Sequence, residues 1–412
     1  MTRTKRDAGA PRARVERRRG FSGTNLERAG DHNQRVTLHA IRVSGPVTRT
    51  DLVLMTGLAS AAVANITNRL LQKRLIVKAG TIRGGRGQPA VKFAVNANSC
   101  YALGLNVDRD HMTMVLVDFA GRVRARSSRQ VPFALPEDVQ KFVRRSASQL
   151  LSRAKVSPAK VVGLGVAFPD DIQRADLPGQ PREYAAWGEI SLGRLLASVL
   201  PLPVFVENDA AAASIGEMHF GLGQRHQCFF YILITAGLGG GLVVDGHYVR
   251  GATGRSGELG LLPSRVADGE CSTVQSIVSL SALAEQLASH GFRISTPREL
   301  AHIGAEAAQI LASWIGTAVD ALESTLVSIN CLINPEIILI GGRLPARVVD
   351  QLAERLNDRM RAYKSIIPSV APVARAALAD DAPAVGAAII PFTERLLPTR
   401  RALMKTSGTD EF

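Results

Sequence analysis

The chain contains 412 residues, of which 46% are hydrophobic, so it is long and apolar enough to bury two or three separate cores and is not disordered throughout. Its formal net charge of +14 lies in the first quarter, because residues 1–95 hold 19 Lys and Arg against 5 Asp and Glu, whereas the remainder holds 31 of each sign. A basic segment on a neutral globular body is typical of a nucleic-acid-binding module joined to a sensor or catalytic body.

Cysteine usage and hydropathy indicate the compartment. The four cysteines, Cys100, Cys228, Cys271 and Cys331, lie far apart and form no CxxC motif, which suits small thiols in a reducing cytosol better than a disulfide framework. The N-terminus has no apolar segment of the signal-peptide type, and we expect no apolar run long enough to span a bilayer. We therefore predict a soluble cytoplasmic protein without a membrane partner.

Residues 1–30 are expected to form a disordered basic tail. Arginines and lysines stand here among Gly, Ala, Thr and Pro, with almost no apolar residue to bury. Two interpretations stay open for this tail. It either attracts nucleic-acid phosphates without sequence preference or serves as a solubilising leader.

Residues 31–96 are predicted to form a winged helix-turn-helix. The apolar period predicts a first helix from residue 33, and a capping box from Thr48 to Asp51 opens a second, short helix. Gly57 then turns the chain into a third helix over residues 60–72. Three helices with a tight glycine turn before the last are typical of this motif.

A wing is predicted after the third helix, because two short strands, residues 75–78 and 91–95, flank a basic, glycine-rich loop. Asparagine on the third helix can pair with an adenine edge, alanine can contact a thymine methyl, and a wing arginine suits a minor groove or a phosphate. A helix-turn-helix that binds protein is the alternative, which the confined basic charge disfavours. The candidate DNA-contacting residues are Arg49, Ser60, Ala61, Ala64, Asn65, Asn68, Arg83, Arg86 and Gln88.

Residues 97–202 are predicted to form a first α/β lobe. Alternating apolar residues predict a meander of three strands over residues 101–107, 112–118 and 123–131. A helix over residues 137–154 and a buried strand over residues 161–167 follow. Strands and a covering helix in this order indicate a mixed sheet with its own core.

Residues 203–380 are predicted to form a second lobe that carries polar loops at the ends of buried strands. Asn208 and Asp209 follow a short strand and can offer an amide and a carboxylate to a sugar hydroxyl. A glycine turn over residues 237–241 allows close backbone approach to a ligand, and Glu258 follows in a third loop. Each feature alone has a structural explanation, namely a helix cap, a hairpin turn or a solvated carboxylate.

These loops and two further motifs together resemble a known family. The motifs are VENDA at residues 206–210, the glycine turn, GELG at residues 257–260, and NPE at residues 334–336 before the Gly341-Gly342 pair. Their order resembles that of the ROK family of repressors and sugar kinases, from Asn33 to Ala387. The resemblance implies an α/β fold in which the winged helix-turn-helix precedes a two-lobed, actin-like (ribonuclease H-like) ATPase-type body. It also implies a C-terminal helix over residues 381–398 that packs on the first lobe, and we expect residues 399–412 to be a frayed tail.

The resemblance implies a sugar-binding cleft in the second lobe. Matched position by position, the effector-binding residues are Asn208, Asp209, Gly239, Glu258 and Gln275. Asp209 falls at the position of the catalytic base of the family's kinases. Gln275 stands where the family has glutamate and still hydrogen-bonds a hydroxyl, so the site is degenerate but able to bind.

One departure from the family pattern argues against kinase activity. Asn106 stands at an acidic position of the phosphate motif, and Asp108, Arg109 and Asp110 replace a Gly-Gly-Thr loop. Two acidic side chains in that turn would repel ATP phosphates. We therefore expect no catalytic residue, with Asp209 only a vestigial base.

A second departure argues against bound zinc. Leu261 stands where family members carry a histidine, and Cys271 is the only thiol in the segment that corresponds to their cysteine cluster. Four ligands are needed to close a structural zinc site. We therefore predict no metal and no other cofactor.

The prediction is a DNA-binding transcriptional regulator of the ROK type, a repressor that senses a sugar or sugar derivative without catalysis. Its partners would be double-stranded operator DNA, a sugar effector and a second copy of the chain, as a homodimer or a dimer of dimers. Two alternatives remain. One is a sugar kinase with an accessory DNA-binding module, and the other is a regulator whose body is a ligand-free dimerisation scaffold.

Overall fold

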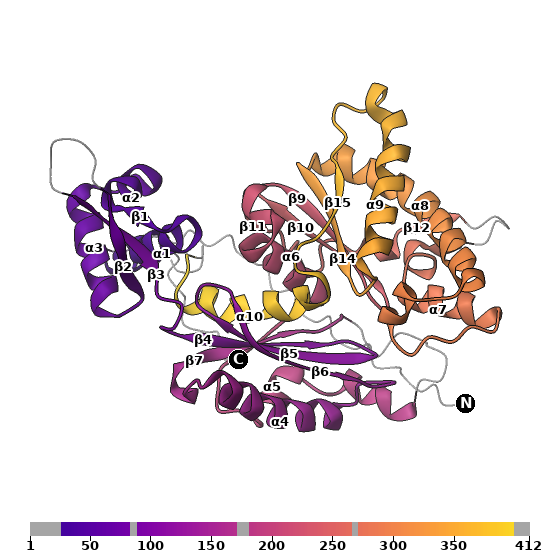
Figure 1. Cartoon of the computed structure of the whole chain (residues 1–412), viewed down its shortest axis with the longest axis horizontal. Coiled ribbons are helices and arrows are strands. Elements are labelled where there is room, and N and C mark those ends of the chain that lie inside the picture. The colour runs from indigo at the N-terminus through magenta and orange to yellow at the C-terminus, as the bar shows by residue number, and fades with distance from the viewer. Residues whose placement is uncertain (1–25, 83–88, 171–180, 266–270, 399–412) are drawn as a thin grey trace, which may run out of the picture.

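The computed structural model describes residues 26–82, 89–170, 181–265 and 271–398 (Figure 1). Residues 1–25 of the predicted tail over residues 1–30, the predicted tail over residues 399–412, and the wing residues Arg83, Arg86 and Gln88 lie outside the described residues. Within these ranges, an N-terminal domain of three helices lies at one end of a larger body that contains two sheets (Figure 1).

The N-terminal domain is a winged helix-turn-helix. Helices α1 (Leu26–Ser44), α2 (Arg49–Thr56) and α3 (Ser60–Gln72) pack over a sheet in the order β1 (Val47–Thr48), β3 (Ala90–Val95), β2 (Ile76–Ile82). The Thr48 side chain accepts from the Asp51 backbone N–H, and the Asp51 carboxylate accepts from the Thr48 backbone N–H, so the predicted capping box is present. Gly57 ends α2 at a φ of 68°, a left-handed conformation that glycine adopts without strain.

The first helix begins earlier than predicted. Residues 26–30 were expected in the disordered tail, but they form the first turn of α1. Arg35 explains part of the difference, because its side chain pairs with Asp31 at 2.7 Å and donates to the backbone oxygens of Glu394 and Leu397 in the body. This tertiary anchor joins residues more than 350 positions apart, so no local pattern could reveal it.

The first lobe contains a five-stranded sheet. Its order is β6 (Val123–Gln130), β5 (His111–Asp118), β4 (Tyr101–Val107), β7 (Val161–Ala167), β8 (Val204–Glu207). Helices α4 (Pro136–Ala154) and α5 (Leu192–Ala197) cover one face, and α10 (Ala382–Arg395) covers the other (Figure 1). The predicted lobe boundary before residue 203 is therefore wrong, because β8 pairs in parallel with β7 and completes the first sheet.

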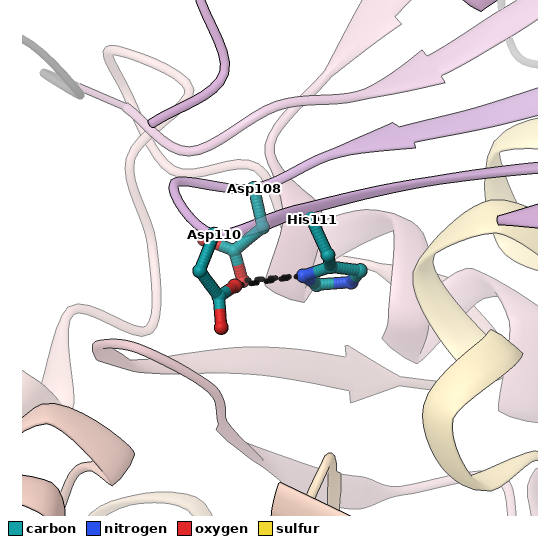
Figure 2. Close-up of side chains that lie close together, drawn as sticks. All are labelled: Asp108, Asp110 and His111. Carbon is teal, nitrogen blue, oxygen red and sulfur yellow. Dashed lines mark hydrogen bonds and ion pairs between the residues drawn. The ribbon is translucent and has the colours of Figure 1, made fainter. Parts of the chain in front are cut away.

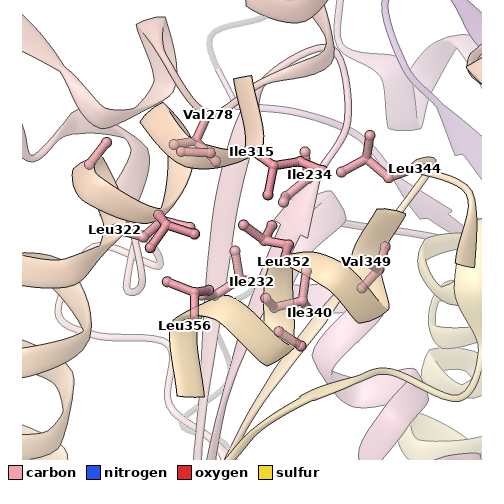
Figure 3. Close-up of a cluster of buried hydrophobic side chains, with 14 of the residues drawn as sticks. Ile232, Ile234, Val278, Ile315, Leu322, Ile340, Leu344, Val349, Leu352 and Leu356 are labelled. Carbon is pink, nitrogen blue, oxygen red and sulfur yellow. The ribbon is translucent and has the colours of Figure 1, made fainter. Parts of the chain in front are cut away.

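The second lobe repeats this strand order. Its sheet runs β11 (His247–Tyr248), β10 (Leu238–Val244), β9 (Phe229–Ile234), β14 (Ile337–Gly342), β15 (Val373–Arg375), and β12 (Pro263–Arg265) pairs with β13 (Cys271–Thr273) beside it. Helices α7 (Leu280–Ser289), α8 (Ala305–Ile333) and α9 (Ala346–Met360) cover one face, where Ile232 and Ile340 meet Leu322 and Leu352 (Figure 3). Helix α6 (Asp209–Phe220) covers the other face. Two mixed sheets with one strand order confirm the predicted two-lobed, actin-like α/β fold.

Two segments are apolar enough to pass a length and hydropathy test for membrane crossing. They are α8 and the α2–α3 pair, which is bent by 116°. The prediction that no apolar run is long enough to span a bilayer is therefore wrong for α8, whose length and composition would allow it. Half of the most apolar window of α8 is buried, and residues such as Leu322 and Leu326 pack in the core of the second lobe, as in a core helix.

Helices α6 and α10 touch backbone to backbone between the two sheets. A Cβ added at Gly386 of α10 would lie 1.7 Å from the carbonyl oxygen of Ala212 in α6. Gly104 of β4 and Gly165 of β7 similarly admit the backbone of α10, since a Cβ would lie 1.9 Å from the Ala384 oxygen and 1.8 Å from the Ala387 oxygen. The first lobe therefore depends on the C-terminal helix for its packing.

The Gly386→Ala variant is expected to lower the free energy of unfolding by about 1–3 kcal/mol, because the added methyl group overpacks a backbone contact. Gly316→Ala is the matched control, since Gly316 lies inside α8 and the nearest atom to its added Cβ is 4.0 Å away. Removing glycine from a helix interior should stabilise by about 0.5–1 kcal/mol. Urea denaturation measures both changes, and equal effects of the two substitutions would contradict the packing argument.

Candidate effector pocket and DNA-binding face

Asn208 and Asp209 open α6 at the boundary between the lobes. The Asn208 Oδ1 accepts from the backbone N–H groups of Ala210 and Ala211 at 2.9 and 3.1 Å, so this residue caps the helix. Its Nδ2 donates to Asp170 Oδ2 at 3.2 Å. Asn208 therefore acts as a helix cap, as one of its two interpretations predicted. Its side chain also lines a cavity with other polar groups.

Asp209 is the most perturbed carboxyl in this cavity. It is 9% exposed, and its Oδ1 accepts from the Ala210 backbone N–H at 2.8 Å. Burial, and secondly the neighbouring Asp108 carboxylate, raises the pKa of Asp209 to about 7. Near neutral pH the group can therefore either donate a hydrogen bond to a ligand hydroxyl or accept one from it.

The glycine turn serves close packing as well as the cavity. A Cβ on Gly239 would lie 2.9 Å from Ala210 Cβ, and one on Gly237 would lie 2.9 Å from Gln275 Oε1 and 3.0 Å from Arg109 Nη1. Gln275 is fixed here because its Oε1 accepts from the Leu238 backbone N–H at 3.1 Å. The glycines thus bring α6, Gln275 and Arg109 against the start of β10.

Glu258 completes the group of predicted effector residues. Its Oε1 accepts from Arg255 Nε at 3.0 Å, and the same Nε lies 3.9 Å from Asp170 Oδ2. The structure places Asn208, Asp209, Gly239, Glu258 and Gln275 around one cavity. The remaining lining residues are Asp108, Arg109, Pro169, Asp170, Thr235, Gly237 and Leu238.

This cavity is small. Its volume is about 70 Å³, below the roughly 300–1,000 Å³ typical of small-molecule sites. Arg109 lines this cavity and also a neighbouring one of about 460 Å³. Arg109, which the sequence analysis noted only as a departure from the family pattern, contributes a positive charge to this cavity, and Asp170 contributes a carboxylate. A sugar would need the lobes or the Arg109 side chain to move before it could enter.

The turn between β4 and β5 ties the two lobes together. Asp110 pairs with His111 at 2.9 Å and with Arg343 of the second lobe at 2.5 Å, and Arg343 also donates to Gln130 Oε1 at 3.0 Å. Burial alone would raise the pKa of Asp110, but the His111 hydrogen bond and the Arg343 charge outweigh it and lower the pKa to about 2. Asp110 thus stays ionised and holds the second lobe through Arg343.

The candidate DNA-binding face lies on α3. Ser60, Ala61, Asn65 and Asn68 are exposed, and Ala64 is half-buried. Arg49 is not free on this face, because its Nε donates to Thr67 Oγ1 at 2.9 Å, its Nη2 donates to Asn68 Oδ1 at 2.7 Å, and its guanidinium lies over the Phe93 ring. Arg49 and Asn68 therefore form one fixed unit, whereas Asn65 has no hydrogen bond to the described residues.

A cluster of basic side chains, missed by sequence reasoning, joins this domain to the body. Arg42 of α1 donates to His219 Nδ1 of α6 at 2.7 Å and lies over the Phe220 ring, and the His39 and His219 rings are 5.9 Å apart. Burial, and secondly Arg42, lowers the pKa of His39 to about 4 and that of His219 well below its usual value. Both imidazoles are thus neutral near pH 7. Helix α6 runs from the cavity to the winged helix-turn-helix domain.

The three-helix N-terminal domain and the two-lobed body define the class of protein by its fold: a winged helix-turn-helix domain on an actin-like body. A sequence model of the ROK family matches residues 102–393, so the chain belongs to the ROK family.

Named relatives and solved structures agree with this assignment. The xylose repressor of Bacillus subtilis (strain 168) is 27% identical over 240 residues, which are 58% of this chain and 62% of that protein. The DNA-binding transcriptional repressor Mlc of Escherichia coli (strain K12) is 24% identical over 339 residues, 77% of this chain and 82% of Mlc. A crystal structure of a ROK family transcriptional regulator, a homologue of E. coli MLC, has a TM-score of 0.63 at 23% identity and covers 88% of this chain and 96% of that one. The ROK hexokinase from Thermus thermophilus has a TM-score of 0.51 at 23% identity, covering 71% and 98%.

Proposed function

We propose that this protein is a transcriptional repressor that binds operator DNA and senses a sugar or sugar derivative in the cleft without catalysis. The observation that carries the proposal is the path of α6. This helix begins with Asn208 and Asp209 in the cavity and ends with His219 and Phe220 against α1 of the winged helix-turn-helix. A ligand that moves the start of α6 therefore acts on the element that holds the DNA-binding domain.

Most of α6 is buried, which makes it suited to transmit such a movement. Ala210, Ala211, Ala212 and Ala213 are at most 1% exposed, and the helix packs on α10 through small residues. A close-packed helix moves as a body because its neighbours leave no room for local bending. The effector shifts operator affinity only if it binds the two arrangements of the lobes with different affinity.

The relatives support the proposed class of effector and partner. Repressors named for xylose and the repressor Mlc resemble this chain over most of its body, which supports a sugar as the effector and operator DNA as the partner. A homodimer or a dimer of dimers is proposed, because two recognition helices related by a two-fold axis double the contacts with a palindromic operator. The protein would act in the cytoplasm and require no cofactor for this function.

The absence of kinase activity is part of the proposal. By the family resemblance, Asp108, Arg109 and Asp110 stand where the kinases have a phosphate loop, and Asp110 pairs with Arg343. Carboxylates in that turn oppose the negative charge of ATP phosphates. The elevated pKa of Asp209 is the one feature that suits a catalytic base, so the test includes an ATP-dependent assay.

Fluorescence anisotropy with the protein's own upstream DNA tests the function, at fixed salt, with excess competitor DNA and a panel of sugars. Specific binding that one sugar weakens or strengthens, with no sugar phosphorylation in the presence of Mg-ATP, is the expected result. Phosphorylation of a sugar would favour the kinase alternative. Specific DNA binding that no sugar changes, with no sugar-induced shift in the melting temperature, would favour a ligand-free scaffold.

The Asn65→Ala variant is expected to bind the operator about 5–150-fold more weakly, the cost of about 1–3 kcal/mol for losing a bidentate base contact. Its affinity for random DNA should not change, because Asn65 carries no charge. Gln72→Ala is the matched control at the exposed last position of the same helix and should bind as the parent does. Anisotropy titrations measure all three proteins, and equal loss on operator and random DNA would contradict a base-reading role.

A further inference from the structure

Three side chains that can ligate a metal meet at the β4–β5 turn. Figure 2 shows the Asp108 and Asp110 carboxylates directed at the His111 ring. One oxygen of each carboxylate and a His111 ring nitrogen all lie within 4.8 Å of one another. His111 Nδ1 is 2.9 Å from Asp110 Oδ1 and 3.9 Å from Asp108 Oδ2. Two carboxylates and an imidazole are a donor set that divalent transition metals accept.

Asp108 provides an independent sign that this cluster accommodates a cation. The residue is 1% exposed, and its Oδ2 accepts no hydrogen bond from the described residues. Its Oδ1 accepts from the Arg109 backbone N–H at 2.7 Å, which fixes the carboxylate with Oδ2 on the side of His111. A buried carboxylate oxygen without a hydrogen bond is costly, and a cation at this point would satisfy it.

The groups around the cluster orient each candidate ligand. Arg343 binds Asp110 through Oδ2, which leaves Oδ1 directed at His111. On the far side of the ring, the Asn106 amide lies 3.2 Å from Nε2, and the buried Asn106 Oδ1 has no partner among the described residues. If the Asn106 side-chain amide is flipped by about 180°, its Oδ1 accepts from His111 Nε2–H. The lone pair of His111 Nδ1 then faces both carboxylates. Metal-binding histidines are typically oriented in this way by an oxygen on the other nitrogen.

We propose that Asp108 Oδ2, Asp110 Oδ1 and His111 Nδ1 form a binding site for a divalent transition metal, with Zn²⁺ as the probe. Three protein ligands of this kind leave a fourth position for water. Binding displaces any proton from His111 Nδ1 into solvent, because the ligand nitrogen must be unprotonated. This proposal departs from the expectation that the protein binds no metal. That expectation rested on the thiol segment around Cys271, whereas the present cluster lies in the other lobe.

The position of the site gives it a connection to both lobes. Asp108 also lines the effector cavity, and Asp110 is bound to Arg343 of the second lobe. A metal ion bound to both carboxylates would hold Asp108 in the cavity wall at a fixed distance from the Asp110–Arg343 ion pair between the lobes. The proposal does not depend on the DNA-binding function.

Isothermal titration of the metal-stripped, full-length protein with Zn²⁺ tests the site. One equivalent should bind per chain, and Asp108→Asn, which keeps the shape of the side chain, should bind at least about 10-fold more weakly. His226→Gln is the matched control, because it removes the imidazole of an exposed His226–Glu336 pair at 3.1 Å, and it should bind as the parent does. Circular dichroism of the variants verifies that they are folded.

Substitution with Co²⁺ provides a measurement on the parent protein alone. Nitrogen and oxygen ligands give visible cobalt bands without the near-ultraviolet charge-transfer band of a thiolate. A thiolate band would place the metal on a cysteine and overturn the proposal. Zn²⁺ affinity that is equal in the parent and Asp108→Asn, or the lack of any stoichiometric binding, would also overturn it.

Discussion

The Asp209→Asn variant is expected to resist unfolding better than the parent at pH 8, and the advantage should shrink as the pH falls. Burial raises the folded-state pKa of Asp209 to about 7 from an ordinary value of 3.8, so the folded state holds a proton that the unfolded state releases. The stability that this group contributes is therefore present at low pH and is lost as the pH rises through about 7. The difference between variant and parent should grow by about 2–3 kcal/mol from pH 5 to pH 8.

Urea denaturation at several pH values, in a buffer that contains a chelator, measures this difference. Asp320→Asn is the control, because the Asp320 side chain is 64% exposed and pairs with Arg359 at the surface. That variant should change the free energy of unfolding by about 1 kcal/mol or less. A constant difference between Asp209→Asn and the parent at every pH would show that Asp209 is not buried as a protonated group.

A gain in stability on losing Asp209 would also bear on function. Buried carboxyls that destabilise the folded state are found where a ligand uses them. Asparagine has the same shape as aspartate and keeps an Oδ1 that accepts from the Ala210 backbone N–H. The substitution therefore removes only the acidic group. The proposed sugar response should weaken in this variant while operator binding in the absence of sugar is kept.

The Arg42→Met variant is expected to bind operator DNA and to lose most of the effect of the sugar. An effector that acts through α6 should change operator affinity by about 5–150-fold in the parent. Arg42 donates to His219 at the end of α6, and methionine keeps the apolar stem against Phe220 while removing that hydrogen bond. Anisotropy titrations with and without the sugar measure the change.

Arg35→Met is the matched control for this experiment. Arg35 lies on the same helix but contacts backbone oxygens at the end of α10 instead of α6. If the signal passes through α6, Arg35→Met should keep the sugar response more fully than Arg42→Met. Equal losses would indicate that any loosening of the domain contact uncouples the two sites, and an intact response in both variants would refute the proposed route.

The elements with strong local signals could be predicted from sequence. The second and third helices of the winged helix-turn-helix domain follow from the Thr48 capping box and the Gly57 turn, and both features have the predicted geometry. The strands of the first lobe follow from alternation of apolar residues, and α10 lies on the predicted lobe. These signals act over a few residues, so the order of residues alone is enough to identify them.

The features that sequence missed depend on contacts between distant residues. The pairing of β8 with β7 shifts a lobe boundary, and the anchor between Arg35 and the end of α10 extends the first helix. The residues around the effector cavity were found through family resemblance, but the small volume and the position of Arg109 follow only from the packing of the two lobes. The contact between Arg42 and His219 joins residues 177 positions apart.

The placement of α10 also determines when the protein can fold during synthesis. Helix α10 covers most of this face of β4 and β7, where α6 adds Ala212 beside Ala167, and Gly104 and Gly165 admit the backbone of α10. The first lobe therefore cannot complete its core until residues near 395 have left the ribosome, although its strands are made among the first of the body. The N-terminal domain emerges earlier, but its Leu38 and Ile41 belong to the same buried cluster as Ile389 and Leu397, so its packing against the body is also completed only when the C-terminal segment arrives.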